Sequence, residues 1–383
     1  MKMTSKERLE AVMRGEVADR IPVSPRIGAF LMGRYGSSSL ESHIRFQKEY
    51  EYDISFTMGS SLPNPTESVL TELPYTDLVK IETEVGQDRD LKIVKRIFHT
   101  PAGKLQDVTM IPPAGREYGV SPNPVKTEWL IKDKSDLEKL VYLLPDPFKH
   151  TNTQGFLNAE KILGDKGIIQ IVIRSPIDKR AGDARGMENL MVDYYEDPEL
   201  FDAVLEFYMD HVMAETKACL EAGVKHIFGS WFYTSLSSGW SPKISREKFI
   251  PLMKRHVELV HSYGATYDLY DDGKFMQVIE DYADTGADVL ETLTPPPVGD
   301  IDLAAAKKLV GDRIVLKGYV DLLYVLKLGT PEMIRETVRE AVEKAGYDGR
   351  FILGTSDSIR DGTPERNVKE YFEAAKRFSV SFC

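Results

Sequence analysis

Eight short apolar segments alternate with helical segments along this chain, and no other sequence feature restricts the fold as much. The apolar segments lie at residues 21–24, 53–58, 167–173, 224–228, around Asp268, and at 287–291, 313–317 and 350–354. Strands that alternate with helices are parallel and are joined by crossover helices. Eight such units in 383 residues favour an α/β fold in which the whole chain, residues 1–383, forms one (β/α)8 barrel of the TIM type.

A stretch at about residues 79–111 departs from this alternation. Residues 81–85, 91–99 and 104–110 are rich in β-type residues, and turn residues separate them at Gln87-Asp88 and at Pro101-Ala102-Gly103. This pattern predicts a β-ribbon that is inserted into the barrel.

Charge and composition exclude several classes of protein. The formal net charge of −11 argues against nucleic acid as a partner, because phosphate binding requires a basic surface. No run of eighteen apolar residues predicts a membrane span, and residues 1–15 lack the apolar core of a secretory signal. Two cysteines, Cys219 and Cys383, are too few for a disulfide framework or a cysteine-rich zinc site. A cytoplasmic protein is the expectation.

Candidate site residues follow from the rule that a parallel barrel carries its chemistry at the carboxyl ends of its strands. The rule selects Arg26, Arg174, Trp231, Tyr233, Asp268 to Asp272, Glu291, Lys317, and residues 355–361, which include Ser356 and Asp357. Two alternatives stay open at this point. Lys317 could simply pair with a neighbouring carboxylate, and Trp231 and Tyr233 could pack beneath a pocket instead of lining it.

The stretch from Gly264 to Lys274 concentrates acids at the end of one strand. Asp268, Asp271 and Asp272 alternate there with tyrosines. Carboxylates this close repel one another, so in a partly buried cleft at least one would be protonated or matched by a cation. The alternative is a solvated acidic turn.

Several segments in order resemble the uroporphyrinogen decarboxylase superfamily. They are Arg8-Leu9, Gly15 and Asp19-Arg20-Ile21-Pro22-Val23 near the start, Leu293-Thr-Pro-Pro-Pro297 with Gly299-Asp300 in the middle, and Lys317-Gly318, Gly329-Thr-Pro331 and residues 355–364 towards the end. The resemblance spans nearly the whole chain and implies a single eight-stranded β/α barrel. Because the superfamily contains several activities, the fold does not decide the reaction.

The decarboxylase branch acts on tetrapyrroles without a cofactor, and two arginines four residues apart bind its substrate's carboxylates. Gly33-Arg34-Tyr35 matches the end of that motif, but Arg26 lies eight residues before Arg34 instead of four. Asp357 stands where the branch has a late histidine. An acid at this place argues against a polyanionic substrate.

A second branch comprises corrinoid-dependent methyltransferases, whose thiol-methylating members bind zinc through histidine and cysteine. The equivalent positions here hold Tyr270, Asp272 and Asp357, so the Cys/His zinc set is absent from the sequence. The chain is more similar to the methyltransferase components of O-demethylase systems, which move a methyl group from an aryl methyl ether to the cobalamin of a partner corrinoid protein. That chemistry needs a general acid or a Lewis-acidic metal at the ether oxygen.

The resemblance therefore implies a set of roles for the residues named above. Asp272, Asp357, Tyr270 and Asp271 are the expected catalytic residues, and Asp272, Asp357 and Glu291 could hold a divalent metal. The expected substrate-binding residues are Arg26, Arg34, Trp231, Tyr233, Asp268, Glu291, Lys317 and Ser356. Two other functions stay open: a cofactor-free decarboxylase and a non-catalytic binding barrel. The expected partners are a small-molecule substrate and a corrinoid protein, with a homodimer left open.

Overall fold

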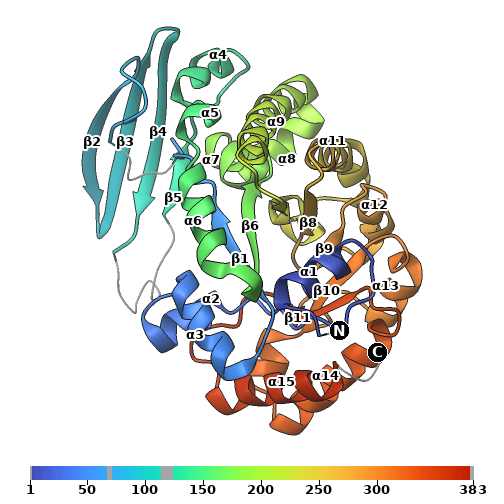
Figure 1. The fold of residues 1–383 in the computed structure, drawn as a ribbon. Helices are drawn as coiled ribbons and strands as arrows, with labels where there is room; N and C mark the ends of the chain where they lie inside the picture. Colours follow the sequence, from blue (N-terminus) through green and yellow to red (C-terminus); the bar gives the residue numbers. More distant parts are fainter. Residues whose placement is uncertain (1, 67–70, 114–123, 380–383) are drawn as a thin grey trace. The chain divides into compact units, whose positions relative to one another are not determined.

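The computed structural model describes residues 2–66, 71–113 and 124–379 (Figure 1). The chain divides into two compact units. Unit 1 takes Met1–Ser60, Thr153–Ile173 and Cys219–Cys383, and unit 2 takes Ser61–Asn152 and Arg174–Ala218. Each unit is therefore assembled from segments that are distant in sequence.

Unit 1 contains a parallel sheet of seven strands in the order β1-β6-β7-β8-β9-β10-β11. The strands are β1 Ile54–Gly59, β6 Gly167–Arg174, β7 His226–Ser230, β8 Thr266–Tyr270, β9 Val289–Leu293, β10 Val315–Val320 and β11 Phe351–Thr355. Apart from β1 and a few residues of β6, β8 and β10, these strands are buried, as strands covered on both faces should be. The α/β barrel class expected from the sequence is confirmed.

Residues 22–24 join the two outer strands of this sheet. Leu353 N donates to Pro22 O and Ser24 N donates to Leu353 O, so Val23 forms a parallel bridge with β11. On the other side Asp53 N donates to Val23 O at 2.8 Å. The first of the eight expected strands is thus one bridging residue, because Pro22 has no N–H with which to extend the ladder.

Helices surround the strands of unit 1, and Figure 1 shows α11 to α14 on the outer side of the sheet. The longer ones are α1 Ser5–Met13, α2 Gly28–Tyr35, α3 Leu40–Tyr50, α6 Thr153–Leu163, α11 Ile250–Ser262, α12 Ile279–Ala283, α13 Leu303–Val310, α14 Pro331–Ala345 and α15 Glu365–Phe378. Within the described residues, no helix has both the length and the apolar content that crossing a membrane requires.

Helix α1 covers the amino-terminal end of the barrel. Thr4 and Glu7 form a capping box that starts the helix. Its apolar face, Leu9, Val12 and Met13, packs against Ile168, Val289, Val315 and Ile352, which all lie at the beginning of their strands. The opposite, carboxyl-terminal end is the one where parallel barrels carry their catalytic residues.

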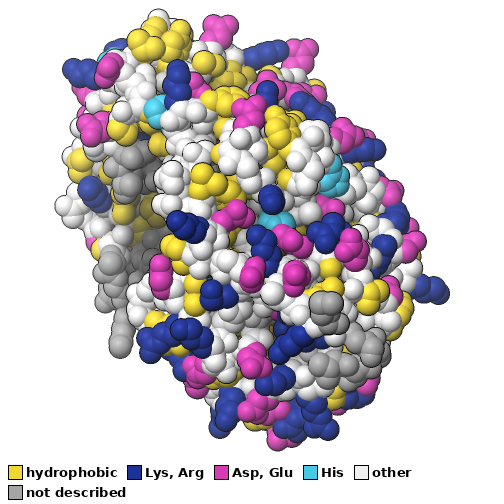
Figure 2. Space-filling view, viewed as in Figure 1, with side chains coloured by type: hydrophobic (Ala, Val, Ile, Leu, Met, Phe, Trp, Pro, Cys, Tyr) yellow, Lys and Arg dark blue, Asp and Glu magenta, His cyan; other side chains and the backbone are white. Residues whose placement is uncertain are grey.

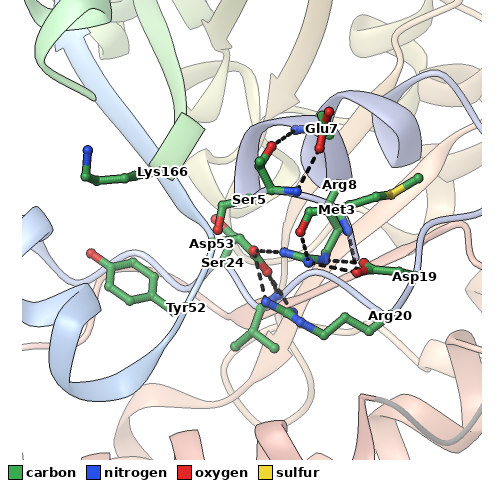
Figure 3. A network of polar contacts seen from close by, with 12 residues as sticks. Met3, Ser5, Glu7, Arg8, Asp19, Arg20, Ser24, Tyr52, Asp53 and Lys166 are labelled. Atoms are coloured by element: carbon green, nitrogen blue, oxygen red, sulfur yellow. Dashed lines mark hydrogen bonds and ion pairs between the residues drawn. The ribbon is translucent and has the colours of Figure 1, made fainter. Parts of the chain in front are cut away.

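One buried carboxylate holds α1, the bridging segment and β1 together (Figure 3). Asp53, at 0% exposure, accepts from Arg8 Nη1 at 2.6 Å and from Arg20 Nη1 and Nη2 at 2.8 and 3.0 Å. The backbone N–H of Val23 also donates to Asp53 Oδ2, at 2.9 Å. Arg8 in turn binds Asp19, so two arginines balance two aspartates.

Unit 2 contains an antiparallel sheet of β2 Lys80–Asp88, β3 Leu91–Thr100, β4 Gly103–Ile111 and β5 Val125–Glu128. The first three strands are the inserted β-ribbon that the sequence predicts. A buried carboxylate again fixes the register, because Asp107 on β4 pairs with Arg96 on β3 and with Lys126 on β5. The remaining helices of unit 2 are α4 Asp136–Leu140, α5 Pro147–His150, α7 Gly182–Ala184, α8 Met187–Glu196 and most of α9 Pro198–Glu221.

Helix α2 is an element that the sequence analysis does not predict. Glycines at positions 28, 33 and 36 lower its helix propensity. The helix forms because Phe30 and Leu31 are buried in the core of unit 1 and because Gly36, at φ +70°, ends it in the left-handed conformation.

We expect Asp53→Ala to destabilise the chain by about 3–5 kcal/mol, because it leaves Arg8 and Arg20 without their shared counter-ion in a buried place. Urea-induced unfolding of the full chain measures this change. Asp312→Asn is the matched control, because Asp312 is exposed and its substitution should shift stability by less than about 0.5 kcal/mol. Equal stability of Asp53→Ala and wild type would contradict the role of this carboxylate.

Candidate active site

Charged side chains from five separate segments of unit 1 converge at the carboxyl ends of its strands. Arg26 follows the bridging segment, Asp272 follows β8, and Asp357 follows β11. Deeper in the barrel lie Asp268 on β8, Glu291 on β9 and Lys317 on β10. The convergence agrees with the rule that selected these residues from the sequence.

The deeper group is a buried network inside the barrel. Lys317 Nζ lies 2.7 Å from Glu291 Oε2 and 3.6 Å from Asp268 Oδ2. Gln170 on β6 donates to Asp268 Oδ2 at 2.9 Å. No more than 3% of any of these four residues is exposed. Lys317 therefore pairs with a neighbouring carboxylate, which is one of the two alternatives that the sequence left open. The side-chain oxygen of Gln170, Oε1, has no hydrogen-bond partner among the described residues.

The two acids of this network have pKa values that shift in opposite directions. Burial, followed by repulsion from Glu291, raises the pKa of Asp268 well above its usual value. Burial by itself would also raise the pKa of Glu291, but attraction by Lys317 and Arg26 outweighs it, so the pKa of Glu291 is lowered. Asp268 thus holds a proton while Glu291 and Lys317 form the ion pair.

Arg26 connects the deep network to the end of the barrel. Its Nη1 lies 3.2 Å from Asp357 Oδ1, and its guanidinium lies over the rings of Tyr270 and Phe228, at 4.8 and 5.4 Å from their centroids. Burial alone would lower the pKa of Arg26, but attraction by Glu291, Tyr270 and Asp357 raises it. The arginine is therefore a fixed cation against an aromatic wall.

Asp272 is a partly exposed acid of the cluster, as is Asp357. Burial raises the pKa of its carboxyl, and the nearby Asp357 carboxylate raises it further, while Arg26 and a hydrogen bond from Tyr270 act in the other direction. The hydroxyl of Tyr270 donates to Asp272 Oδ2 at 3.4 Å. Asp272 and Asp357 thus influence each other although 85 positions separate them in the sequence.

Asp271 points away from the cluster into the protein. At 0% exposure, it accepts from Tyr282 Oη at 2.6 Å and from Asp272 N at 2.7 Å. Burial raises the pKa of Asp271 to about 8. This acid fixes the loop that presents Asp272, so its placement makes it a positioning residue.

The arrangement does not fit a divalent metal. Among the described residues, no group of three or more His, Cys, Asp or Glu side chains is arranged to hold an ion. Of the three expected ligands, Asp357 pairs with Arg26 and Arg360, and Glu291 pairs with Lys317. Cations therefore already pair with two of the three acids that a metal would need.

Four of the expected substrate-binding residues form contacts elsewhere in the protein. Trp231 is fully buried and donates from Nε1 to Tyr267 Oη, on the outer side of β8. Tyr233 is half-buried and packs on Phe232. Arg34 pairs with Glu49 and Glu365 on helices α3 and α15. The hydroxyl of Ser356 accepts from Leu322 N. These contacts tie the four side chains to neighbours outside the Arg26 cluster.

Sequence reasoning missed three contributors to the site. Gln170 is the one polar residue within the apolar run of β6, and this exception was a usable signal. Phe228 lies in β7 and Tyr282 in α12, Ile279–Ala283, where aromatic residues are ordinary core material. Only the fold shows that the ring of Phe228 packs under Arg26 and that the hydroxyl of Tyr282 donates a hydrogen bond to Asp271.

Comparison with known proteins adds three similarities. The family model described as Uroporphyrinogen decarboxylase (URO-D) matches residues 180–378, which is 199 of the 383 residues. Uroporphyrinogen decarboxylase from Prochlorococcus marinus is 31% identical over 192 residues, 48% of this chain and 50% of that protein. The chloroplastic uroporphyrinogen decarboxylase 2 of Arabidopsis thaliana is 28% identical over 186 residues, 48% of this chain and 44% of that protein. The chain thus spans about half the length of these curated relatives.

A solved structure is similar over almost the whole chain. The methyltransferase from Methanosarcina mazei superimposes with a TM-score of 0.66 and covers 98% of this chain and 99% of its own, at 17% identity. At that identity the likeness concerns the fold.

We expect Asp271→Asn to change the pH dependence of stability. The pKa of Asp271 is about 8 when folded and near its usual 3.8 when unfolded. Between these values only the folded chain keeps the proton, so its contribution to stability falls as pH rises, by up to about 1.4 kcal/mol per pH unit. The asparagine cannot ionise.

Urea-induced unfolding at pH 5 and pH 8 measures the effect. The difference in unfolding free energy between Asp271→Asn and wild type should move in the variant's favour at pH 8. Asp312→Asn, the exposed control, should show no such movement. A difference that stays the same at both pH values would contradict the assignment.

Proposed function

We propose that this chain, which belongs to the uroporphyrinogen decarboxylase family, transfers a methyl group from a small methoxylated aromatic substrate to a corrinoid protein. The observation that carries the proposal is Asp272, an acid of raised pKa that is partly exposed beside an arginine and an aromatic wall. Its fold is also that of a solved methyltransferase, so the fold accommodates such an activity.

The chemical requirement of the reaction is a proton. The methyl–oxygen bond of an aryl methyl ether breaks, the methyl group passes to the reduced cobalt of the corrinoid partner, and the electron pair of the bond stays on oxygen. A carboxylic acid that protonates this oxygen converts a phenolate leaving group into a phenol. A raised pKa keeps Asp272 protonated at higher pH, which suits it to donate this proton.

The surrounding residues suit a flat substrate that carries little negative charge. Phe228 and Tyr270 stack within 5.1 Å of each other, and Phe232 meets Tyr270 edge-on. Arg26 is already balanced by Asp357, so a substrate with several carboxylates would meet more acid than base. Asp271 and Tyr282 fix the loop of Asp272 from behind.

The second candidate is a cofactor-free decarboxylase. The identity with curated uroporphyrinogen decarboxylases favours it, and Arg26 is a group that could bind a substrate carboxylate. The two reactions differ in their products, because one yields a methylated corrinoid and the other yields carbon dioxide. Assaying both products with the same preparation separates them, and a non-catalytic binding barrel would yield neither.

We expect Asp272→Asn to slow methyl transfer by about 10²- to 10⁴-fold, the usual contribution of a general acid. Single-turnover transfer from an aryl methyl ether to a cob(I)alamin-loaded corrinoid protein, followed by the cobalt spectrum, measures the rate. Asp272→Glu should restore part of the rate, and Asp312→Asn should leave it unchanged. Full activity of Asp272→Asn would refute the acid role.

We expect the rate of the wild type to fall as pH rises through the pKa of Asp272, because only the protonated acid acts. Asp357→Asn removes the carboxylate that raises this pKa and frees Arg26 to lower it. The fall should therefore occur at lower pH in Asp357→Asn. A pH profile that is the same in both proteins would show that Asp272 is not the titrating group.

A further inference from the structure

A cavity of about 620 Å³ lies at the amino-terminal end of the barrel, opposite to the cluster around Arg26. All of its lining residues belong to unit 1. They come from the start of the chain, from the end of α3, from the residues that precede β1 and β6, and from α15. The proposed reaction makes no use of this cavity, and its volume falls within the range of about 300–1,000 Å³ typical of small-molecule sites.

Part of the cavity wall is apolar. Val23, Tyr52, Phe372 and Ala375 are buried residues that line it, and Met3 is partly buried beside them. The hydroxyl of Tyr52 is engaged by His43 Nδ1 at 3.0 Å and so is not a free polar group of this wall. This wall suits an apolar group of a ligand.

The charged residues of the lining are mostly basic. Two of the six cations, Arg8 and Arg20, are bound to Asp53, and Lys376 pairs with Glu51. The other three are Lys2, Lys48 and Lys166, which form no ion pair among the described residues. Asp165 is the acid of the lining that remains to oppose them. The cavity thus has an excess of positive charge in a chain whose net charge is −11.

A buried hydroxyl adds an independent sign of a ligand. Ser379 lines the cavity and is 1% exposed, and its Oγ has no hydrogen-bond partner among the described residues. A buried hydroxyl without a partner is unfavourable, and a ligand oxygen would satisfy it.

From the apolar wall, the excess of lysines and this hydroxyl, we propose that the cavity binds a small amphipathic anion. The ligand carries an apolar body and one carboxylate or phosphate group. The body lies against Tyr52 and Phe372, and the anionic group meets the ammonium groups of Lys2, Lys48 and Lys166. The site is separate from the proposed catalytic end, so its test does not depend on any activity.

Calorimetric titration of the full chain with four probes of equal chain length tests the proposal. They are octanoate, octyl phosphate, octylamine and octanol. We expect at least one anion to bind with a dissociation constant of about 100 μM or lower, and the cation and the alcohol to bind at least about tenfold more weakly. The tighter of the two anions identifies the head group as carboxylate or phosphate.

A pair of matched double variants tests the location. Lys48→Glu with Lys166→Glu reverses two of the three unpaired charges and should weaken anion binding at least about tenfold. Lys161→Glu with Lys369→Glu makes the same charge change on α6 and α15, at exposed lysines outside the cavity, and should change binding less than about twofold. Circular dichroism and thermal unfolding confirm that both variants fold.

Three results would overturn the proposal. The first is that neither anion binds at millimolar concentration, in which case Lys48 and Lys166 serve only as surface cations. The second is that octylamine or octanol binds as tightly as the anions. The third is that both double variants lose affinity equally, because the anion then responds to overall charge and not to this cavity.

Discussion

The barrel of unit 1 depends on the neutralisation of Asp53. Its sheet is joined between β1 and β11 by one bridging residue, Val23, whose N–H donates to the Asp53 carboxylate and whose C=O accepts from the Asp53 N–H. A carboxylate buried at this place needs a cation, and Arg8 from α1 and Arg20 supply it. The charge of Asp53 therefore fixes α1, the bridging segment and β1 relative to one another.

Figure 2 shows that acidic and basic side chains on the visible face of the molecule are mixed, as on an ordinary protein surface.

At the other end of the barrel, charge is balanced by protons as well as by cations. Four carboxyl groups, those of Asp268, Asp272, Glu291 and Asp357, lie with two buried or partly buried cations, Arg26 and Lys317. Arg360 adds a third cation that is largely exposed and so contributes less. Burial raises the pKa values of Asp268 and Asp272, and repulsion from Glu291 and from Asp357, respectively, raises them further. A site that retains protons in this way is suited to acid catalysis.

The sequence predicted the barrel because the alternation of apolar strand segments and helices is repeated along the chain. It was less informative where a single residue determines the local structure. Apolar runs identified β6 to β11. Near the start of the chain the sequence did not predict that the segment after Pro22 forms only one bridging residue, or that the glycine-containing residues 28–35 form helix α2. The strand-end rule brought Arg26, Asp272 and Asp357 together correctly, since it depends only on topology. It could not show that Asp271 and Trp231 turn away from the cluster. The direction of a side chain beyond a strand end is set by the loop, here by Tyr282 and Tyr267, which lie on other parts of the chain.

Depth in the barrel distinguishes the two acids whose pKa values are raised, Asp268 and Asp272. Asp268 is 1% exposed and lies next to Lys317, which pairs with Glu291, so its carboxyl is shielded from solvent. Asp272 is partly exposed, so water can return its proton after each transfer. A general acid must both donate and recover a proton in every turnover. This requirement favours Asp272 as the donor, while Asp268 belongs to the buried network of Lys317 and Gln170.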